Sequence, residues 1–459
     1  MDKFDALDRF VLEKVSETKL PGLSLAVVKD GRVVYSRGYG FRDIEYGKPA
    51  TPETLYCIGS VTKSFTCIAI MQLQERGLLN VEDEIGKHIP FSLKPKGESV
   101  RISHLMSHSS GIPALAYLEA AIRHTMKSAN TWLPLVDGKD MISFMDGAEA
   151  WAHNKPGERW FYLNEGYRLL EAIIEVVSGE RYTDYVKRHI LKPLGMSRSF
   201  YSREEVEEDP EAATPYIVTR DGERLPSTYA YGICTADGGL ISCASDMAKY
   251  IAMFLNGGIG HSGKVLSSES LSEMMRPRIR TPDEPWITRN TKYYGFGLNS
   301  AEDTLGNKVI SHGGSVTTAT AQLAFIPEKR VGVIVLANGT GYPLSYIADY
   351  TLALLNDGNP EQMPVILFER ALEEVEGVYE TYKGTMKGKI QRKGSLLSLE
   401  TGDKYRDVTV PLVPVDWLGD VKLFEGLSGD RKQRVEFYRE GGEQYLIYER
   451  YKMRKVGKI

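Results

Sequence analysis

Apolar positions recur with a helical period at the start of the chain and with a strand-like pattern soon after. Apolar residues at helical spacing over residues 4–15 predict an N-terminal amphipathic helix. Two β-rich runs, 23–28 and 33–35, flank Asp30-Gly31, and this arrangement predicts a β-hairpin. Similar runs return only late in the sequence, at 320–326 and 331–336, on either side of a turn.

The long middle section, from Ser60 to about Arg203, has mainly helical periodicity. The clearest helical segments are 65–78, 167–177 and 182–190, with further helices expected within 238–255 and over 343–355. We expect the third to close at Leu191-Lys192-Pro193 and the fourth to start at Ser245-Asp246. Because strands occur early and late with helices between them, the pattern predicts one sheet built from both ends of a domain, plus an all-helical lobe.

The composition shifts near residues 356–360. Beyond Leu372 the pattern alternates and is punctuated by turns, as in 390–399 around Lys393-Gly394 and 435–448 around Gly441-Gly442. Short strands with regular turns predict a small antiparallel barrel or sandwich of about 85 residues. We therefore expect a first domain over 1–360, a linker over 361–372 and a barrel domain over 373–459.

Composition limits the classes of function. The chain has 459 residues, of which 42% are hydrophobic, which suits a globular protein with two or three domains. Its net charge of −4 argues against nucleic acid as the main partner. No stretch is apolar enough to span a bilayer and the N-terminus lacks a signal-peptide pattern, so we expect a cytoplasmic protein with no membrane partner. Scarce glutamine hints at a heat-adapted, thermophilic source.

The cysteines, the histidine pair and the runs of charged residues are better explained by packing or solvation than by metal binding. No C-x-x-C pair occurs, so free buried thiols are expected at Cys57, Cys67, Cys234 and Cys243. His104 and His108 have a spacing that can bind zinc on a helix, but no third ligand is spaced nearby, and we favour packing. The acidic run 204–209 is expected to be a solvated loop, and the basic tail 450–458 one wet face of a terminal strand.

Ser60 and Lys63 form the most informative motif, S-x-x-K, where a strand-like run (54–58) gives way to a helical one. A spacing of three places both side chains on one face of a helix, so the lysine can contact the serine hydroxyl. A serine hydroxyl is a poor nucleophile without a neighbouring base. Ser60 would also lie at a helix N-terminus, where backbone N–H groups favour developing negative charge.

Two further motifs can complete such a site. Tyr162-Leu163-Asn164 offers a phenol for acid–base work and an amide for a substrate carbonyl. The glycines of His312-Gly313-Gly314 would let an edge-strand backbone approach a substrate closely. A serine hydrolase needs a nucleophile, a base, a proton donor and two N–H groups for the oxyanion, and these motifs can supply them. The sequence has no G-x-S-x-G elbow, which argues against a Ser-His-Asp hydrolase.

Together, S-x-x-K, Y-x-N and H-x-G resemble the motifs of the serine β-lactamase and penicillin-recognising superfamily, closest to its class C branch and the S12-type peptidases of the CubicO group. Other segments are similar to family signatures, namely Ser103-His104-Leu105-Met106-Ser107-His108-Ser109-Ser110-Gly111, Pro156-Gly157 to Tyr167, Lys192-Pro193-Leu194-Gly195-Met196 and Asp237-Gly238-Gly239-Leu240. The order and spacing agree over roughly residues 20–340. The resemblance implies an α+β, multidomain fold: an antiparallel sheet flanked by helices with an all-helical lobe, followed by a small antiparallel β-barrel.

The resemblance also implies roles residue by residue. Ser60 would be the acylated nucleophile, Lys63 its proton-relay partner, Tyr162 the general base or acid, and Asn164 a contact to the substrate amide. His312 stands where the K-T-G version of the third motif has lysine, which argues against efficient β-lactam hydrolysis. With Gly313 and Gly314 beside the substrate, the oxyanion hole would be the N–H groups of Ser60 and Ser315. No cofactor or metal is expected.

The activity that the resemblance implies is hydrolysis of small peptides through an acyl-enzyme, with preference for D-amino-acid residues. A carboxylesterase would use the same residues, and a penicillin-binding or non-catalytic sensor could keep the fold, so both alternatives stay open. The C-terminal section resembles the lipocalin-like barrel appended to some of these peptidases. This second resemblance implies a homo-oligomer and access restricted to small or end-exposed peptide substrates.

Overall fold

The computed structural model describes residues 3–127, 138–219, 221–232, 234–282, 291–302, 306–393, 396–402 and 404–458. The chain divides into two compact units, and the main division falls between Gly358 and Asn359. Each unit has its own sheet and core, so the two are described separately.

An antiparallel sheet is the centre of the first unit. Its strands, in spatial order, are β10 (Ile279–Arg280), β11 (Tyr293–Tyr294), β12 (Asn299–Glu302), β13 (Lys308–Ser315), β14 (Thr320–Ile326), β15 (Val331–Ala337), β1 (Gly22–Lys29), β2 (Arg32–Asp43) and β3 (Lys48–Pro49). The first strands of the chain thus pair with its late strands, with Leu23 opposite Ala337. This pairing confirms the prediction of one sheet built from both ends of the domain.

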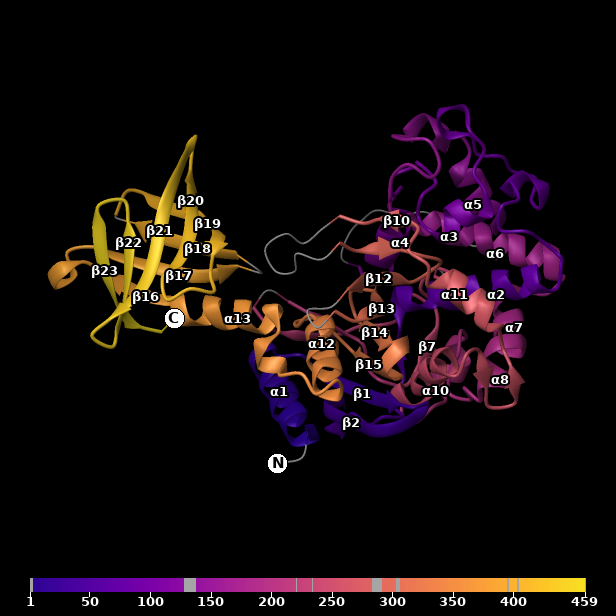
Figure 1. Ribbon diagram of the computed structural model, residues 1–459, viewed down its shortest axis with the longest axis horizontal. Coiled ribbons are helices and arrows are strands. Elements are labelled where there is room, and N and C mark those ends of the chain that lie inside the picture. The colour runs from indigo at the N-terminus through magenta and orange to yellow at the C-terminus, as the bar shows by residue number, and fades with distance from the viewer. Residues whose placement is uncertain are drawn as a thin grey trace. The chain divides into compact units, whose positions relative to one another are not determined.

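Local sequence explains how the central strands form. Asp30 and Gly31 both take positive φ, 51° and 74°, which is the conformation that an Asp-Gly hairpin turn requires between β1 and β2. All seven residues of β15 are buried, because helices cover both faces of the sheet. Figure 1 shows α1 (Lys3–Thr18) and α12 (Leu344–Leu355) on one face and α10 (Ala244–Leu255) on the other. The helices expected over 4–15, within 238–255 and over 343–355 are confirmed.

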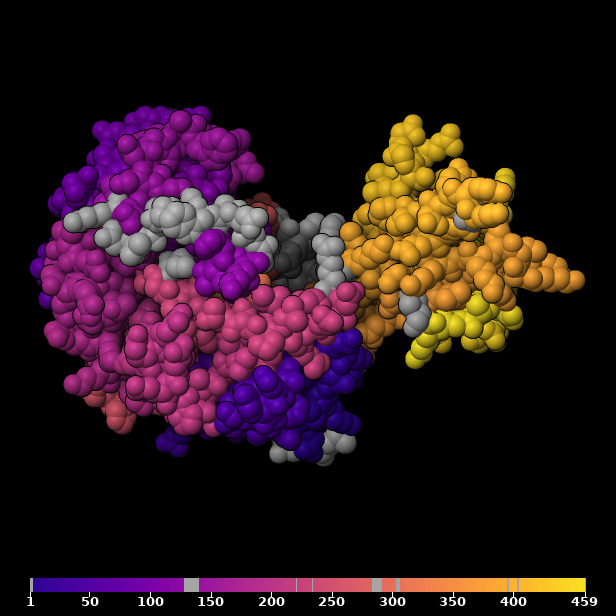
Figure 2. Space-filling view, turned by 180° about the vertical axis from the view of Figure 1, so that it is seen from behind, coloured from indigo at the N-terminus to yellow at the C-terminus, as the bar shows by residue number. Residues whose placement is uncertain are grey.

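Helices fill the chain between β4 and β10. Their bounds are α2 (Thr62–Glu75), α3 (Ile102–Met106), α4 (Tyr117–Thr125), α5 (Gly138–Met145), α6 (Asn164–Ser178), α7 (Tyr182–Val186), α8 (Lys192–Leu194), α9 (Arg203–Glu207) and α11 (Ser268–Met274). Short strand pairs accompany them: β4 (Tyr56–Cys57) with β7 (Ile241–Ser242), β5 (Tyr216–Val218) with β6 (Arg224–Pro226), and β8 (Ile259–Gly260) with β9 (Gly263–Lys264). In the space-filling view, the purple part of this helical lobe lies at the end of the unit away from the indigo N-terminal segment (Figure 2).

Two sequence expectations in this lobe were wrong. The helix after Tyr182 does not close at Pro193; a π-helical turn over Lys187–Leu191 leads into α8, which ends at Gly195 with φ of 70°. Proline is tolerated there because it sits in the first turn of α8, where its missing N–H is not needed. The acidic run expected as a loop is partly helical, since the Ser202 hydroxyl caps α9 by accepting from the Glu205 N–H at 3.1 Å.

The second unit contains a closed antiparallel barrel, which confirms the barrel predicted from the alternating pattern. Its strands are β16 (Gly377–Glu380), β17 (Lys387–Lys393), β18 (Leu396–Gly402), β19 (Asp407–Asp416), β20 (Lys422–Ser428), β21 (Arg431–Glu440), β22 (Glu443–Tyr448) and β23 (Tyr451–Gly457). Alternate side chains point inward, so Leu412, Phe424 and Phe437 are fully buried. The predicted basic tail lies on β23, where most basic side chains face water.

Helix α13 (Pro364–Val375) belongs to this second unit and coincides with most of the segment expected as a linker, 361–372. It packs on the barrel: the Phe368 ring meets the Trp417 ring edge to face at 5.1 Å, and Glu369 pairs with Arg392 at 3.2 Å. The segment before the barrel is therefore an ordered part of that unit.

The cysteines are free and buried, as predicted. Within the described ranges, no helix combines the length and the apolar character needed to cross a membrane.

Candidate active site

The structure brings Ser60 and Lys63 into contact. Ser60 lies in a short 3₁₀ turn, Gly59–Val61, that leads directly into α2; Gly59 has a positive φ of 51°, whereas Val61 and Thr62 are in the right-handed helical region. Residues three apart on such a backbone share a face, so Lys63 Nζ donates to Ser60 Oγ at 3.1 Å. The strand-like run 54–58 before it yields only the two-residue strand β4.

The Lys63 ammonium is fully buried, although it carries a charge. Its Nζ donates to the backbone oxygen of Asp237 at 2.5 Å as well as to Ser60. It also lies over the rings of Tyr162 and Tyr167, 4.8 and 5.3 Å from their centroids. Oriented dipoles and aromatic faces therefore stabilise the cation where water cannot.

Tyr162, predicted as the general base or acid, has its ring beside Lys63. Its ring is half-buried and packs against the Lys63 ammonium. In the part of the chain that the structure describes, its hydroxyl forms no hydrogen bond. The phenol is thus close to Lys63 and free to exchange a proton with a ligand.

His312 lies on β13 and is already fully engaged. Its Nδ1–H donates to the Gly313 carbonyl at 2.7 Å, so Nε2 must accept from the Tyr294 hydroxyl, also at 2.7 Å. Burial, followed by the nearby charge of Lys63, lowers the pKa of His312 to about 3. The histidine is therefore neutral, and it cannot replace the cation that a lysine would provide at this position.

The end of β13 runs against the turn that holds Ser60. A Cβ on Gly314 would lie 2.0 Å from the Ile58 carbonyl oxygen, and a Cβ on Gly59 would lie 2.7 Å from the Ser315 nitrogen. Only glycine permits this approach, and Gly59 also has a positive φ of 51°. The backbone nitrogens of Ser60 and Ser315, predicted to form the oxyanion hole, thus belong to two segments in direct contact.

Asn164 is the first residue of α6, two residues after Tyr162. Its Nδ2 donates to Glu119 Oε1 across 3.4 Å, and its Oδ1 finds no hydrogen-bond partner among the described residues, although Asn164 is only 6% exposed. The sequence predicted Asn164 as a contact to substrate but gave no reason to expect Glu119 beside it.

His108, from the segment Ser103–Gly111 that resembles a family signature, holds the backbone on both sides of Tyr162. Its carbonyl accepts from the Phe161 N–H at 2.8 Å, and its Nδ1 accepts from the Leu163 N–H at 3.0 Å. Its ring lies 4.0 Å from the Tyr162 ring, centroid to centroid. Burial, then the charge of Lys63, keeps the pKa of His108 well below its ordinary value. A neutral histidine therefore fixes the position of Tyr162.

A buried polar network supports Lys63 from behind, and the sequence did not reveal it. The Tyr117 hydroxyl donates to Asp237 Oδ2 at 2.7 Å, while the Tyr117 N–H donates to Glu165 Oε1 at 3.1 Å. Burial raises the pKa of Glu165 to about 7, although two backbone N–H groups oppose that effect. Arg168 pairs with Glu171 at 2.5 Å in the same region.

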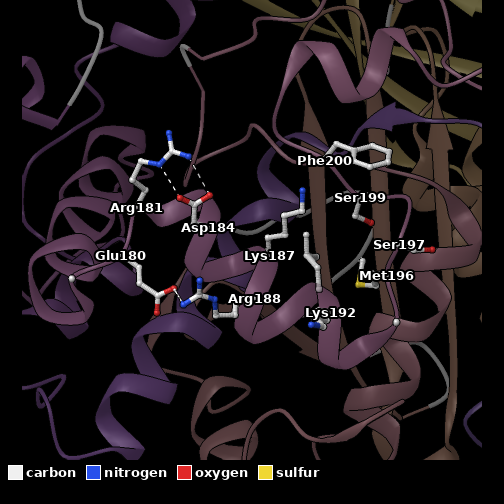
Figure 3. A pocket seen from close by; sticks show the side chains of 13 residues that line it. Glu180, Arg181, Asp184, Lys187, Arg188, Lys192, Met196, Ser197, Ser199 and Phe200 are labelled. Atoms are coloured by element: carbon white, nitrogen blue, oxygen red, sulfur yellow. Dashed lines mark hydrogen bonds and ion pairs between the residues drawn. The ribbon is translucent and has the colours of Figure 1, made fainter.

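A separate cavity of about 780 Å³ lies away from these motifs, around α7 and α8. Figure 3 shows that its two arginines turn to carboxylates, Arg181 to Asp184 at 2.8 Å and Arg188 to Glu180 at 3.0 Å. Neither a nucleophile–base pair nor an unpaired arginine lines it. Across the described ranges there is also no cluster of three or more residues suited to hold a metal ion.

The role of His108 can be tested through stability. His108→Phe keeps a ring beside Tyr162 but removes the acceptor for the buried Leu163 N–H, so the free energy of unfolding should fall by about 1–3 kcal/mol. His108→Asn should lose less, because its amide oxygen can accept the same hydrogen bond and asparagine tolerates the positive φ of 56°. Urea unfolding of both variants provides the comparison, and equal losses would contradict this role.

Glu165 gives a pH-dependent prediction. The folded chain holds this proton up to about pH 7, whereas the unfolded chain loses it near pH 4.5, so its contribution to stability is present at low pH and is lost as pH rises. The free energy of unfolding of Glu165→Gln, relative to that of wild type, should therefore rise by about 3 kcal/mol between pH 4.5 and pH 8, at about 1.36 kcal/mol for each unit of pKa difference. Chemical unfolding at several pH values measures this difference in free energy of unfolding. Glu208→Gln, at an exposed position, is the control, and its difference from wild type should not change with pH.

Comparisons with known proteins agree with this geometry. The Beta-lactamase family profile matches residues 7–357, and the profile of the Pab87 octamerisation domain matches residues 360–454. Protein flp of Staphylococcus aureus (strain MW2) is 27% identical over 349 residues, which cover 73% of this chain and 63% of that protein. The chain thus spans less than two thirds of the length of this curated relative.

Two solved structures extend the comparison. The octameric penicillin-binding protein homologue from Pyrococcus abyssi is 44% identical, with a TM-score of 0.93, and the match covers 99% of this chain and 100% of that one. The penicillin binding protein from Bacillus halodurans is 25% identical, with a TM-score of 0.61, over 75% of this chain and 98% of that one. With its family profile matched over most of its length, the chain belongs to the beta-lactamase family, whose members are generally serine hydrolases.

Proposed function

We propose that this protein is a serine peptidase that hydrolyses small peptides through an acyl-enzyme at Ser60, with preference for substrates that contain D-amino acids. The observation that carries the proposal is the contact between Lys63 Nζ and Ser60 Oγ at 3.1 Å, with Tyr162 packed on the same ammonium. The proposed nucleophile and the ring of the proposed second proton carrier thus both adjoin the Lys63 ammonium, an arrangement that supports covalent catalysis.

The proposed reaction has two stages. For turnover the Lys63–Tyr162 pair must start with one proton fewer than an ammonium and a phenol carry together. Ser60 Oγ then attacks the substrate carbonyl, this pair takes the serine proton, and the N–H groups of Ser60 and Ser315 hold the oxyanion. The pair then protonates the departing amine, which leaves an ester on Ser60. In the second stage water attacks this ester, the pair accepts and returns one proton, and the carboxylic acid departs.

Substrate preference rests on different support. The motifs resemble those of D-peptidases, and a 44% identical protein is described as a penicillin-binding protein homologue. The neutral His312 argues against strong binding of the carboxylate of a β-lactam. A carboxylesterase remains the alternative within the same chemistry, and a non-catalytic penicillin-binding sensor the alternative without turnover.

The nucleophile can be tested directly. Ser60→Ala should reduce kcat for matched D-residue peptides at least about a thousandfold, because loss of the attacking group usually costs several powers of ten. The exposed Ser197→Ala serves as the matched control and should retain wild-type turnover. Peptides and esters with the same acyl group, in D and L forms, separate the alternatives. Hydrolysis that survives in Ser60→Ala would rule out the mechanism, and turnover of esters alone would favour the carboxylesterase.

We also propose that the chain forms a homo-oligomer through its second unit. The support is the match of residues 360–454 to an octamerisation domain and the octameric state of the Pyrococcus abyssi homologue. Light scattering of the full chain after size exclusion should give about eight times the mass of one chain. A mass equal to one chain at micromolar concentration would contradict assembly.

A further inference from the structure

We propose that the side of the active site formed by Asn164 and Glu119 is a subsite for the free α-ammonium group of a substrate, so that the enzyme acts on the N-terminal residue of small peptides. This inference rests on the proposed function, because it assigns the end of the peptide that Ser60 attacks. It follows from an unsatisfied acceptor at Asn164, an unpaired carboxylate at Glu119 and the lack of a cation at the third motif.

The unsatisfied acceptor belongs to Asn164. The residue is 6% exposed, its Oδ1 has no partner in the part of the chain that the structure describes, and its Nδ2 makes a long contact of 3.4 Å with Glu119 Oε1. A buried amide oxygen without a hydrogen-bond donor is unfavourable. Because the Glu119 carboxylate lies next to Asn164, a donor that carries a positive charge would be favoured there. An ammonium group, with three N–H donors and one charge, suits both oxygens.

The unpaired carboxylate belongs to Glu119, an exposed residue in the first turn of α4. In the described part of the chain Glu119 forms no ion pair with lysine, arginine or histidine; Arg123 follows it by one turn on α4, and Arg168 of α6 pairs with Glu171. Glu165, 1% exposed, adds a carboxyl group whose Oε2 lacks a hydrogen-bond partner among the described residues. Among the described residues, this side of the site therefore has acceptors that are not paired with a cation.

Helix α4 holds Glu119 in a fixed relation to the nucleophile. The Tyr117 hydroxyl donates to Asp237 Oδ2, and the Asp237 carbonyl accepts from Lys63 Nζ, which contacts Ser60. On the other side, Asn164 follows Tyr162 by two residues on the segment that packs on Lys63. Both halves of the subsite are thus connected to the reacting centre through short, buried contacts.

The missing cation is at the third motif, on β13. His312 is neutral and donates only to the Gly313 carbonyl, so this motif provides no positive charge for a substrate carboxylate. A site with free acceptors at Asn164 and a neutral histidine at β13 favours the positive end of a peptide over its negative end. The substrate residue that acylates Ser60 would then carry the free amine.

This assignment also gives a physical basis for stereochemical preference. If the carbonyl carbon is fixed at Ser60 and the ammonium nitrogen at Glu119, two of the substituents of the α-carbon are fixed. The side chain of the substrate residue then points in different directions in the D and L forms. A site that has room for the side chain in one direction therefore discriminates against the other form.

The test compares D-alanine p-nitroanilide with its N-acetyl and N-succinyl derivatives. Wild type should prefer the free amine, and its KM for that substrate alone should rise as pH passes about 8, where an α-amino group loses its proton. Glu119→Gln should raise the KM for the free amine about 10- to 100-fold, the range of a lost charge-assisted contact, and change the N-acetyl substrate less than about twofold. Glu204→Gln, an exposed change on α9, is the matched control.

A charge reversal makes the test sharper. Glu119→Lys should lose the preference for the free amine and gain turnover of the N-succinyl substrate, whose carboxylate it can pair. Equal effects of Glu119→Gln on all three substrates, or a wild-type preference for the N-acetyl form, would overturn the subsite while leaving Ser60 chemistry intact. Full hydrolysis in Ser60→Ala would instead overturn the proposed function, and the subsite with it.

Discussion

The enclosure of the Lys63 ammonium is the constraint on which the rest of this site depends. Taking a cation out of water carries a penalty of several kcal/mol, and in the described chain no carboxylate forms an ion pair with Lys63 to offset it. The Asp237 carbonyl, Ser60 Oγ and two tyrosine rings offset it instead. Each of these groups must be held in place, and this requirement explains the buried bonds from Tyr117 to Asp237 and from Tyr167 to the Met106 carbonyl.

A buried positive charge also determines the protonation of its neighbours. It disfavours a second cation nearby, so it adds to burial in lowering the pKa values of His108 and His312. Both imidazoles are neutral, and hydrogen bonds determine their tautomers: His108 accepts through Nδ1, while His312 donates through Nδ1 and accepts through Nε2. The histidines act as positioned dipoles, and the lysine is the only charged member of the trio.

The sequence predicted those features of the structure that depend on short-range periodicity and residue spacing. The hairpin at Asp30-Gly31, the paired late strands and the contact of Ser60 with Lys63 follow from local geometry, and the structure confirms them. Tyr294 was missed because it lies in a two-residue strand, β11, which has no periodicity to read. The Tyr117–Asp237 bond was missed because it joins residues 120 apart, and no local pattern encodes such a pair. The π turn before Pro193 depends on packing, which propensity alone does not report.

The S-x-x-K and H-G-G motifs, although some 250 residues apart in sequence, form one structural unit, and glycine is the reason. The Ile58 carbonyl and the Ser60 nitrogen lie 2.0 and 3.2 Å from where a Cβ on Gly314 would be, so any side chain at that position would push β13 away from the nucleophile. Gly59 imposes the same condition from the other side, toward the Ser315 nitrogen. The separation of the two segments, and hence of the two N–H groups that would face an oxyanion, is therefore set by the absence of two methyl groups. A serine and lysine at the correct spacing become a candidate catalytic pair only where a second segment can approach this closely.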